Sequence, residues 1–251
     1  MENSEYTPLY RRIKHLLTNG LAHREWAPGE PLPSENKLAR RFEVSIGTVR
    51  KAIDELVDER VVVREQGRGT FVATHNSSRL LFHFFHIVER GGSKEYPKIK
   101  TLSFRRGRAD MDEAQKLEIA ERAPVFRIRN LLSLCGRPTI VDDIVLPRSL
   151  VPDLNEKIFI GRDNTIYHLY QSRYGLNVLR TSERLSATCA DPDVAKLLGV
   201  KKEASLLEIN RIALTYHHAP VELRRSVVNT ERHDYFSDLG KSPLRRHDPR
   251  F

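Results

Sequence analysis

The sequence has little cysteine: Cys135 and Cys189 are the only two in 251 residues. Neither belongs to a CxxC pair or to a Cys/His cluster, so the sequence gives no sign of a zinc site. In a cytosolic chain, two isolated thiols are usually small side chains of the hydrophobic core. We therefore expect both cysteines to be buried.

Long hydrophobic runs are absent as well. Apolar residues make up 39% of the chain and charged residues 30%, and no run approaches the ~20 apolar residues that span a bilayer. The N-terminal stretch MENSEYTPLY is polar and acidic, whereas a signal peptide needs a basic start and an apolar segment. These features predict a cytoplasmic protein with no membrane partner.

The sequence also lacks the common catalytic motifs. It contains no HExxH, GxSxG or P-loop pattern, and its ten histidines have no metal-ligand spacing. We expect neither an enzyme nor a bound cofactor or metal. His217 and His218 fall at a predicted hairpin turn, where exposure to solvent is the simplest interpretation.

The positive charge is not concentrated near the N-terminus. The formal net charge is +9, yet residues 1–74 hold 12 Lys and Arg against 11 Asp and Glu. Residues 241–251 hold four against one. A polyanionic partner must therefore be argued from motifs and their placement, because overall charge alone is weak support.

Three helices are predicted at the N-terminal end of the chain. Thr7 and Pro8 suit an N-cap and a first helical position, and apolar residues then recur at helical spacing: Leu9, Ile13, Leu16, Leu17 and Leu21. After the proline-rich loop 27–33, Ser34 caps a second helix with Leu38, Ala39 and Phe42 facing inward. Ser45 caps a third helix, whose inward positions are Val49, Ala52, Ile53 and Leu56.

A β-hairpin is predicted after the third helix. The runs 61–63 and 70–72 are rich in β-branched and aromatic residues, and the glycine-containing segment 64–69 lies between them. Two short helices with a tight turn, followed by such a hairpin, form a winged helix-turn-helix, and its second helix enters the major groove of DNA.

The outward face of the third helix carries side chains suited to DNA. If Val49, Ile53 and Leu56 face inward, hydroxyls, cations and an unobstructed glycine face outward at Ser45, Gly47, Thr48, Arg50 and Lys51. Arg and Lys contact guanine edges or phosphates, and Ser and Thr contact phosphates or bases. The wing tip adds Gln66, Gly67 and Arg68. The alternative for each cation taken singly is an ordinary solvated surface charge.

The remainder of the chain predicts an α+β domain. Residues 73–79 are polar and unpatterned, and we set the borders at 1–74 for the DNA-binding domain, 75–79 for a linker, 80–245 for the second domain and 246–251 for a basic tail. Strands are predicted at 80–88, 98–104, 125–134, 139–146, 178–188, 206–216 and 221–228, with helices at 112–119, 165–174 and 193–198.

A weak internal repeat relates two parts of this domain. Residues 112–117, Arg129 and Pro138 recur further along the chain as residues 193–198, Arg211 and Pro220, each set following the order helix, strand, turn, strand. The match suggests a pseudo-symmetric fold with a cleft between two halves. It is short enough to arise by chance.

The run LPSENKLARRFEVSIGTVRKAIDELVDERVVVREQGRGTFV closely resembles the DNA-binding domain of GntR-type bacterial regulators. The chain after this run resembles the UTRA effector domain of the HutC subfamily, which has a chorismate lyase-like fold. The resemblance implies a homodimer that binds palindromic operators, usually as a repressor, and that releases DNA when a metabolite binds. It places DNA contacts on Asn36, Ser45, Thr48, Arg50, Gln66 and Gly67. The family often has arginine where this chain has Ile46, so we expect specificity to depend more on Arg50, Lys51 and the wing.

The same resemblance places effector contacts in the second domain, on Arg127, Arg129, Asp142, Thr165, Tyr167 and Glu222. Arginine forks suit a carboxylate or phosphate, and acidic side chains suit hydroxyls or amines. Cross-strand ion pairs on an exposed sheet face are the alternative. Relatives that sense sugar phosphates carry a Thr-Ser-Phe-type segment where this chain has LLFHFFHIV, so we favour a carboxylate-bearing or aromatic metabolite.

Two other functions fit the sequence. The second domain could be a lyase-like enzyme attached to a DNA-binding domain, although a fold does not establish a chemistry. It could also serve only to dimerise a regulator that binds DNA constitutively.

Overall fold

The structure is a computed structural model, and it describes residues 8–75, 83–91, 95–162 and 164–237. The predicted cap Thr7, most of the linker 75–79 and the basic tail 246–251 lie outside the described residues. The chain divides into two compact units. The first contains residues 1–77, 162–180 and 213–221, and the second contains residues 78–161, 181–212 and 222–251.

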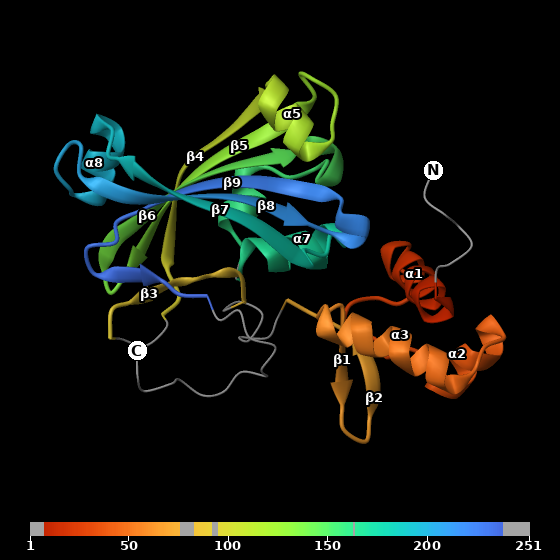
Figure 1. The fold of residues 1–251 in the computed structure, drawn as a ribbon. Helices are drawn as coiled ribbons and strands as arrows, with labels where there is room; N and C mark the ends of the chain where they lie inside the picture. The colour runs from red at the N-terminus through yellow and green to blue at the C-terminus, as the bar shows by residue number, and fades with distance from the viewer. Residues whose placement is uncertain (1–7, 76–82, 92–94, 163, 238–251) are drawn as a thin grey trace. The chain divides into compact units, whose positions relative to one another are not determined.

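The three predicted helices are present in the first unit (Figure 1), as α1 (Leu9–Ala22), α2 (Glu35–Phe42) and α3 (Ile46–Asp58). Both predicted serine caps are confirmed: the Ser34 hydroxyl accepts a hydrogen bond from the Lys37 amide at 3.4 Å, and the Ser45 hydroxyl accepts one from the Thr48 amide at 3.1 Å. These bonds satisfy amide groups that have no partner inside the helix.

The start and the apolar face of α1 differ from the prediction. Pro8 has the extended backbone of an N-cap (φ −53°, ψ 139°) and is not the first helical residue. Ile13, Leu17 and Leu21 are buried as expected, whereas Leu9 and Leu16 are exposed. The buried residues of α1 therefore form an i, i+4, i+8 row, and the helix packs against α3.

The wing is a two-stranded antiparallel sheet of β1 (Val62–Glu65) and β2 (Gly69–Val72). Gly67 at its tip has φ +74°, a backbone conformation that glycine adopts without steric cost. The residues predicted to face inward from α2 and α3 join one core with the wing: Leu38, Ala39, Val49, Ala52, Ile53, Leu56, Val62 and Val72. Phe42 packs against this core and is partly buried.

Six antiparallel strands form the main sheet, in the order β4-β5-β6-β9-β8-β7. Their bounds are β4 (Lys98–Arg108), β5 (Pro124–Leu134), β6 (Arg137–Pro147), β7 (Arg180–Cys189), β8 (Ser205–Leu214) and β9 (Pro220–Val228). Each overlaps a predicted strand. The α+β class is therefore confirmed, with an N-terminal helical region and wing and an antiparallel sheet after it.

The predicted repeat appears in the topology. Helix α5 (Met111–Leu117) precedes β5 and β6, and α8 (Pro192–Leu198) precedes β8 and β9. Strands β4, β5 and β6 follow one another inward from one edge of the sheet, and β7, β8 and β9 do so from the other edge. The two halves therefore meet at β6 and β9. The number of residues from the start of α5 to the start of α8 equals the number from the start of β5 to the start of β8. The sequence match pairs Arg129 with Arg211, and these two residues are one position further apart than that.

The segment predicted as a strand at 80–88 is mostly not one. Residues 80–82 lie outside the described residues, and only β3 (Ile87–Glu89) is extended, paired with β10 (His233–Tyr235). Its pairing partner comes from the far end of the sequence, which a local pattern cannot reveal. Elsewhere the described residues also form α6 (Glu156–Ile160), α7 (Ile166–Tyr174) and two short 3₁₀ turns at Arg148–Leu150 and Tyr216–His218.

Both cysteines are exposed, which contradicts the predicted burial. Cys135 lies in the turn between β5 and β6 with φ +47°, and Cys189 ends the edge strand β7. His217 and His218 are exposed, as predicted. Among the described residues, no helix is both long and apolar enough to cross a membrane.

Candidate functional site

The residues predicted to contact DNA lie on α2, in the first part of α3 with its cap, and at the wing tip, and most of them are exposed. Asn36, Ser45, Gly47, Arg50 and Lys51 are exposed, and Thr48 is partly buried. The wing residues Gln66, Gly67 and Arg68 are also exposed. No side chain occupies the space beside Gly47, where an added Cβ would meet only the Ser45 hydroxyl at 3.8 Å. The backbone at this point can therefore approach a phosphate closely.

Arginines on this surface are paired with carboxylates. Arg50 Nε lies 2.9 Å from Glu35 Oε2, and Arg64 Nη2 lies 3.3 Å from Glu35 Oε1. Arg64 Nη1 also lies 2.7 Å from Asp54 Oδ1. Glu35, Arg50, Asp54 and Arg64 thus form a chain of ion pairs across α2, α3 and β1, which we call the Glu35 network. Its formal charge is zero.

Two other cations stack on aromatic rings. The Lys51 ammonium lies 4.2 Å from the centroid of the Tyr10 ring, and the Arg68 guanidinium lies 5.2 Å from that of Phe71. Arg68 is also paired with Glu65. Exposed contacts of this kind are weak, so these cations can exchange them for phosphate oxygens.

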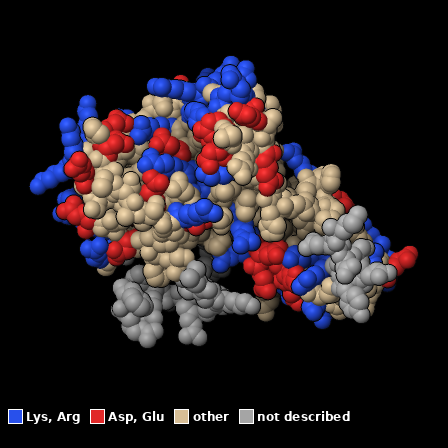
Figure 2. Space-filling model, turned by 45° about the horizontal axis from the view of Figure 1, so that its top comes forward, with Lys and Arg blue, Asp and Glu red and all other residues tan. Residues whose placement is uncertain are grey.

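Basic and acidic side chains are intermixed on the face of the protein shown in Figure 2. Residues 1–74 by themselves also have a near-zero charge balance. Recognition of a polyanion by this region would therefore depend on where individual cations stand, rather than on a large single-sign field.

The predicted effector residues of the sheet lie on opposite faces. Arg129 is directly opposite Asp143 on β6, and its neighbour Asn130 is opposite Asp142. Because successive side chains of a strand point to opposite faces, Arg129 and Asp142 are on different sides of the sheet. Glu222 shares a face of β9 with Ser226, which is opposite Asp142.

Arg127 and Arg129 are two positions apart on β5 and therefore share one face of the sheet, where each contacts a helix. Arg127 donates hydrogen bonds of 2.6 and 2.8 Å to Glu113 of α5. Arg129 lies 3.3 Å from Asp143 and 2.9 Å from Asp193 of α8. These contacts tie each helix to the sheet. They match the cross-strand and surface ion pairs that the sequence left open as an alternative.

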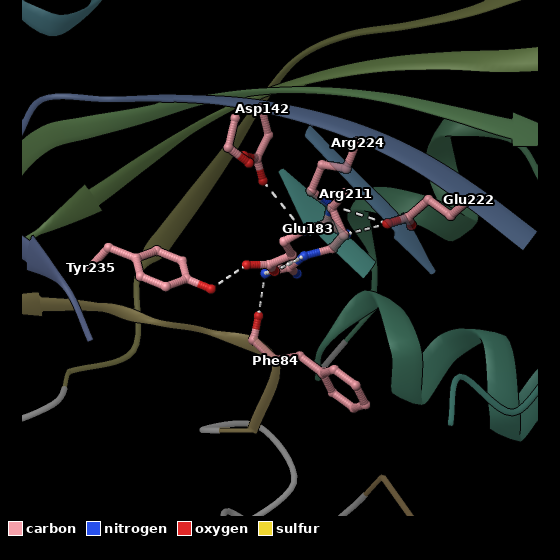
Figure 3. A network of polar contacts seen from close by, with 8 residues as sticks. Phe84, Asp142, Glu183, Arg211, Glu222, Arg224 and Tyr235 are labelled. Carbon is pink, nitrogen blue, oxygen red and sulfur yellow. Dashed lines mark hydrogen bonds and ion pairs between the residues drawn. The ribbon is translucent and has the colours of Figure 1, made fainter. Parts of the chain in front are cut away.

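The opposite face holds a buried group of charged residues (Figure 3). Asp142 accepts a hydrogen bond of 2.5 Å from the Ser226 hydroxyl and lies 3.4 Å from Arg224. Arg224 also lies 2.9 Å from Glu222, which has no exposed surface. Burying this many charges costs free energy unless each is paired, so the pairing of these residues is required by the fold.

A second ion pair joins this group on the same face (Figure 3). Arg211 donates from Nε to Glu183 at 2.6 Å and from Nη2 to the Phe84 carbonyl at 2.6 Å. Burial opposes ionisation of Glu183, but the Arg211 charge and a hydrogen bond from the Tyr235 hydroxyl outweigh it and lower the pKa of Glu183. Burial and the same hydrogen bond raise the pKa of Tyr235.

We call this group the sheet network: Phe84 (through its carbonyl), Asp142, Glu183, Arg211, Glu222, Arg224, Ser226 and Tyr235. Only Asp142 and Glu222 were predicted from the sequence. Arg224 and Ser226 follow from strand periodicity once the register is known, since both alternate with Glu222 along β9. The contacts of Arg211, Glu183 and Tyr235 join distant segments and leave no local signal.

The two predicted effector residues on α7 belong to the first unit. Thr165 is the N-cap of this helix, and its hydroxyl accepts a hydrogen bond from the His168 amide at 3.2 Å. Tyr167 is buried, and its ring centroid lies 5.9 Å from that of Tyr170. Their role in ligand binding stays a prediction. Across the described part of the chain, no group of three or more His, Cys, Asp or Glu side chains could hold a metal ion.

Comparisons with known proteins agree with both parts of this architecture. The family described as "Bacterial regulatory proteins, gntR family" matches residues 9–72, and the UTRA domain family matches residues 93–234. The transcriptional regulator YurK of Bacillus subtilis is 28% identical over 92% of this chain and 96% of its own. The transcriptional repressor NagR of the same organism is 26% identical over 91% and 93%.

A solved structure is also similar. The ligand-binding domain of a GntR-family transcriptional regulator from Bordetella bronchiseptica is 31% identical, with a TM-score of 0.59, over 62% of this chain and 98% of its own. The UTRA match covers more than half of the chain and follows a DNA-binding match with the expected helices and wing. The protein is therefore a DNA-binding transcription regulator, not an enzyme, and belongs to the GntR family in the branch that carries a C-terminal UTRA effector domain.

Proposed function

We propose that the protein is a repressor that leaves its operator when a small metabolite binds to the sheet domain. The exposed start of α3 and the wing tip supply the DNA-binding surface, with Arg50, Gln66 and Arg68 as its principal side chains. The name of the relative NagR, a transcriptional repressor, supports repression. The cytoplasm, where the bacterial chromosome lies, is the compartment in which this function would operate.

The effector is proposed to bind on the face of the sheet that carries Asp142 and Glu222. The observation that carries this proposal is the sheet network, a buried set of fixed carboxylates and guanidinium groups. Such groups recognise a polar ligand by charge and hydrogen bonding. A ligand held there would be on the other side of the sheet from Arg127 and Arg129. The carboxylate-bearing or aromatic metabolite expected from the sequence remains the preferred class.

The regulator is proposed to act as a homodimer on a palindromic operator. One helix-turn-helix has a limited contact area, and two-fold dimers place their recognition helices in half-sites about 34 Å apart. The chain mass is 29.0 kDa, so light scattering should return about twice that value at micromolar concentration. A monomer mass would contradict this part of the proposal.

A thermal-shift screen of a metabolite library tests the sensing function. A ligand that binds the folded protein raises the melting temperature by mass action. The stabilising metabolite should then lower the affinity of the protein for its operator. If no metabolite shifts the melting temperature, the sheet domain is better explained as a dimerisation domain of a constitutive DNA binder.

Two variants locate the ligand on one face of the sheet. Glu222→Gln keeps the size of a side chain in the sheet network, and Arg129→Ala changes the opposite face. Glu222→Gln should keep operator binding and lose the response to the metabolite, whereas Arg129→Ala should respond like the parent. The reverse result would place the effector beside α5 and α8.

A further inference from the structure

The Glu35 network connects the parts of the DNA-binding surface to one another. Glu35 is the first residue of α2, Arg50 and Asp54 are one turn apart on α3, and Arg64 is on the wing strand β1. The Glu35 carboxylate contacts both arginines, one with each oxygen. Asp54 holds the other end of Arg64. The wing and the recognition helix are therefore linked by charge as well as by their common core.

The two sides of the Glu35–Arg50 pair differ in exposure. The Arg50 side chain is 59% exposed and the Glu35 side chain is 25% exposed. The carboxylate therefore lies behind the guanidinium, against the protein, and solvent or DNA approaches from the Arg50 side. The contacts to Glu35 use Nε and Nη2, which form one edge of the guanidinium. A guanidinium has a second edge, formed by its two terminal nitrogens, that suits the O6 and N7 atoms of guanine.

A paired arginine behaves differently from an unpaired one on DNA. Phosphate binding depends on charge and tolerates many orientations, whereas bidentate base contacts require a fixed direction. A carboxylate beside the guanidinium reduces its gain from a phosphate and also restricts its rotamers. Both effects reduce non-specific binding more than they reduce a correctly aimed base contact.

We propose that Glu35 is a positioning residue that sets operator specificity by aiming Arg50 at base edges and disfavouring its capture by phosphates. Arg64 and Asp54 extend this role to the wing, by fixing the direction of β1 relative to α3. The proposal rests on DNA contact by α3, as in the proposed function. Glu35 itself touches no DNA and acts through Arg50.

The test compares two duplexes and two variants of the full-length protein. The specific probe is the duplex that the parent selects from a randomised library, and the non-specific probe has the same bases in shuffled order. Glu35→Gln removes the charge and keeps the shape. Glu25→Gln is the matched control, since it also removes a carboxylate paired with an arginine, Arg41, on α2 but away from α3.

The proposal predicts that Glu35→Gln binds the shuffled duplex more tightly and loses discrimination. The ratio of the two dissociation constants should fall about threefold to fivefold, the effect expected of an exposed ion pair. The salt dependence of shuffled-duplex binding should steepen by about 0.9, as Arg50 gains one phosphate. Glu25→Gln should leave the ratio unchanged, and Glu35→Asp, which keeps the charge, should restore most of it.

A double-mutant cycle separates positioning from a structural role. In an Arg50→Ala background, Glu35→Gln should no longer change the ratio, because Glu35 acts through Arg50. A parallel loss of affinity for both duplexes, or an equal fall of the ratio in Glu25→Gln, would overturn the proposal. If the parent protein selects no sequence from the library, it does not bind DNA sequence-specifically, and the proposed function fails. That result is seen before any variant is made, so it is distinct from a failure of the proposal about Glu35.

Discussion

The Glu35 network and the sheet network both consist of arginines paired with carboxylates, but the first is exposed to solvent and the second is buried. In the Glu35 network the arginines are open to solvent, with 59% of the Arg50 side chain exposed. In the sheet network the Arg211 and Arg224 side chains are 10% and 13% exposed, and Glu222 has no exposed surface. An exposed ion pair contributes about 0–1 kcal/mol to stability, whereas removing one partner of a buried pair costs about 3–5 kcal/mol.

The difference in burial matches the difference in task. The DNA-binding surface must meet and leave DNA many times, so arginines that stay exposed and are held only by weak pairs suit it. An effector site must distinguish one metabolite from many, so fixed and dehydrated charges suit it. The comparison therefore predicts large effects on stability from the sheet network and effects on DNA binding from the Glu35 network.

The largest expected effect comes from Arg211→Ala. This change leaves Glu183 buried without its cation and should lower the free energy of unfolding by about 3–5 kcal/mol. Arg50→Ala, the matched exposed change, should lower it far less, because solvent screens an exposed ion pair. Urea denaturation of the two variants measures both values, and similar losses would remove the distinction between the networks.

Acid should weaken the sheet network in a defined pH range. The pKa of Glu183 is lowered from its unfolded value of 4.5, so the ionised carboxylate stabilises the fold fully above about pH 4.5. This stability is lost as the pH falls from there through the folded-state pKa. Glu183→Gln should flatten the dependence of the urea midpoint on pH in this range. An unchanged pH profile would mean that Glu183 is not the titrating group.

Arg50→Ala should weaken binding to the selected operator by roughly 1–3 kcal/mol without unfolding the protein. A gel-shift or anisotropy titration measures the loss, and the urea midpoint serves as the control for folding. If the variant binds like the parent, the outward face of α3 is not the surface that docks on DNA.

The smallest expected effect concerns Arg68 at the wing tip. Its pairing with Glu65 and stacking on Phe71 leave it exposed, and it is placed for a backbone contact. Arg68→Ala should weaken specific and shuffled duplexes alike, with a salt slope shallower by about 0.9. A loss confined to the specific duplex would instead assign Arg68 to base recognition.

The sequence predicts the elements well and the faces of the sheet poorly. Helix caps at Ser34 and Ser45 and the glycine at the wing tip are local signals, and the structure confirms them. The face of a strand residue reverses with a shift of one position. The sequence repeat aligns Arg129 with Arg211. These residues are one position further apart than the starts of β5 and β8, the strands that carry them. The two arginines consequently lie on opposite faces of the sheet.

Other errors have equally physical causes. Cys135 is exposed because it stands in a tight turn, where its sulfur lies within hydrogen-bond distance of carboxylate oxygens of Glu95 (3.0 Å) and Glu89 (3.3 Å). These hydrogen bonds raise the pKa of Cys135 to about 12. The strand predicted at 80–88 fails because β3 is defined by pairing with β10, which lies near the other end of the chain. The exposure of Cys135 and the extent of β3 both depend on tertiary contacts, which the hydrophobic periodicity of the sequence does not reveal.

Control of DNA binding by a metabolite is tested most directly by an operator titration with and without the metabolite found by thermal shift. Differential affinity for the DNA-competent and DNA-incompetent states is the only means by which a ligand can move this equilibrium. Saturating metabolite should weaken operator binding by the parent about 5- to 150-fold. Glu222→Gln should bind the operator with the parent's affinity and show no such change. An operator affinity that is the same with and without a metabolite that stabilises the protein would contradict control of DNA binding by that metabolite.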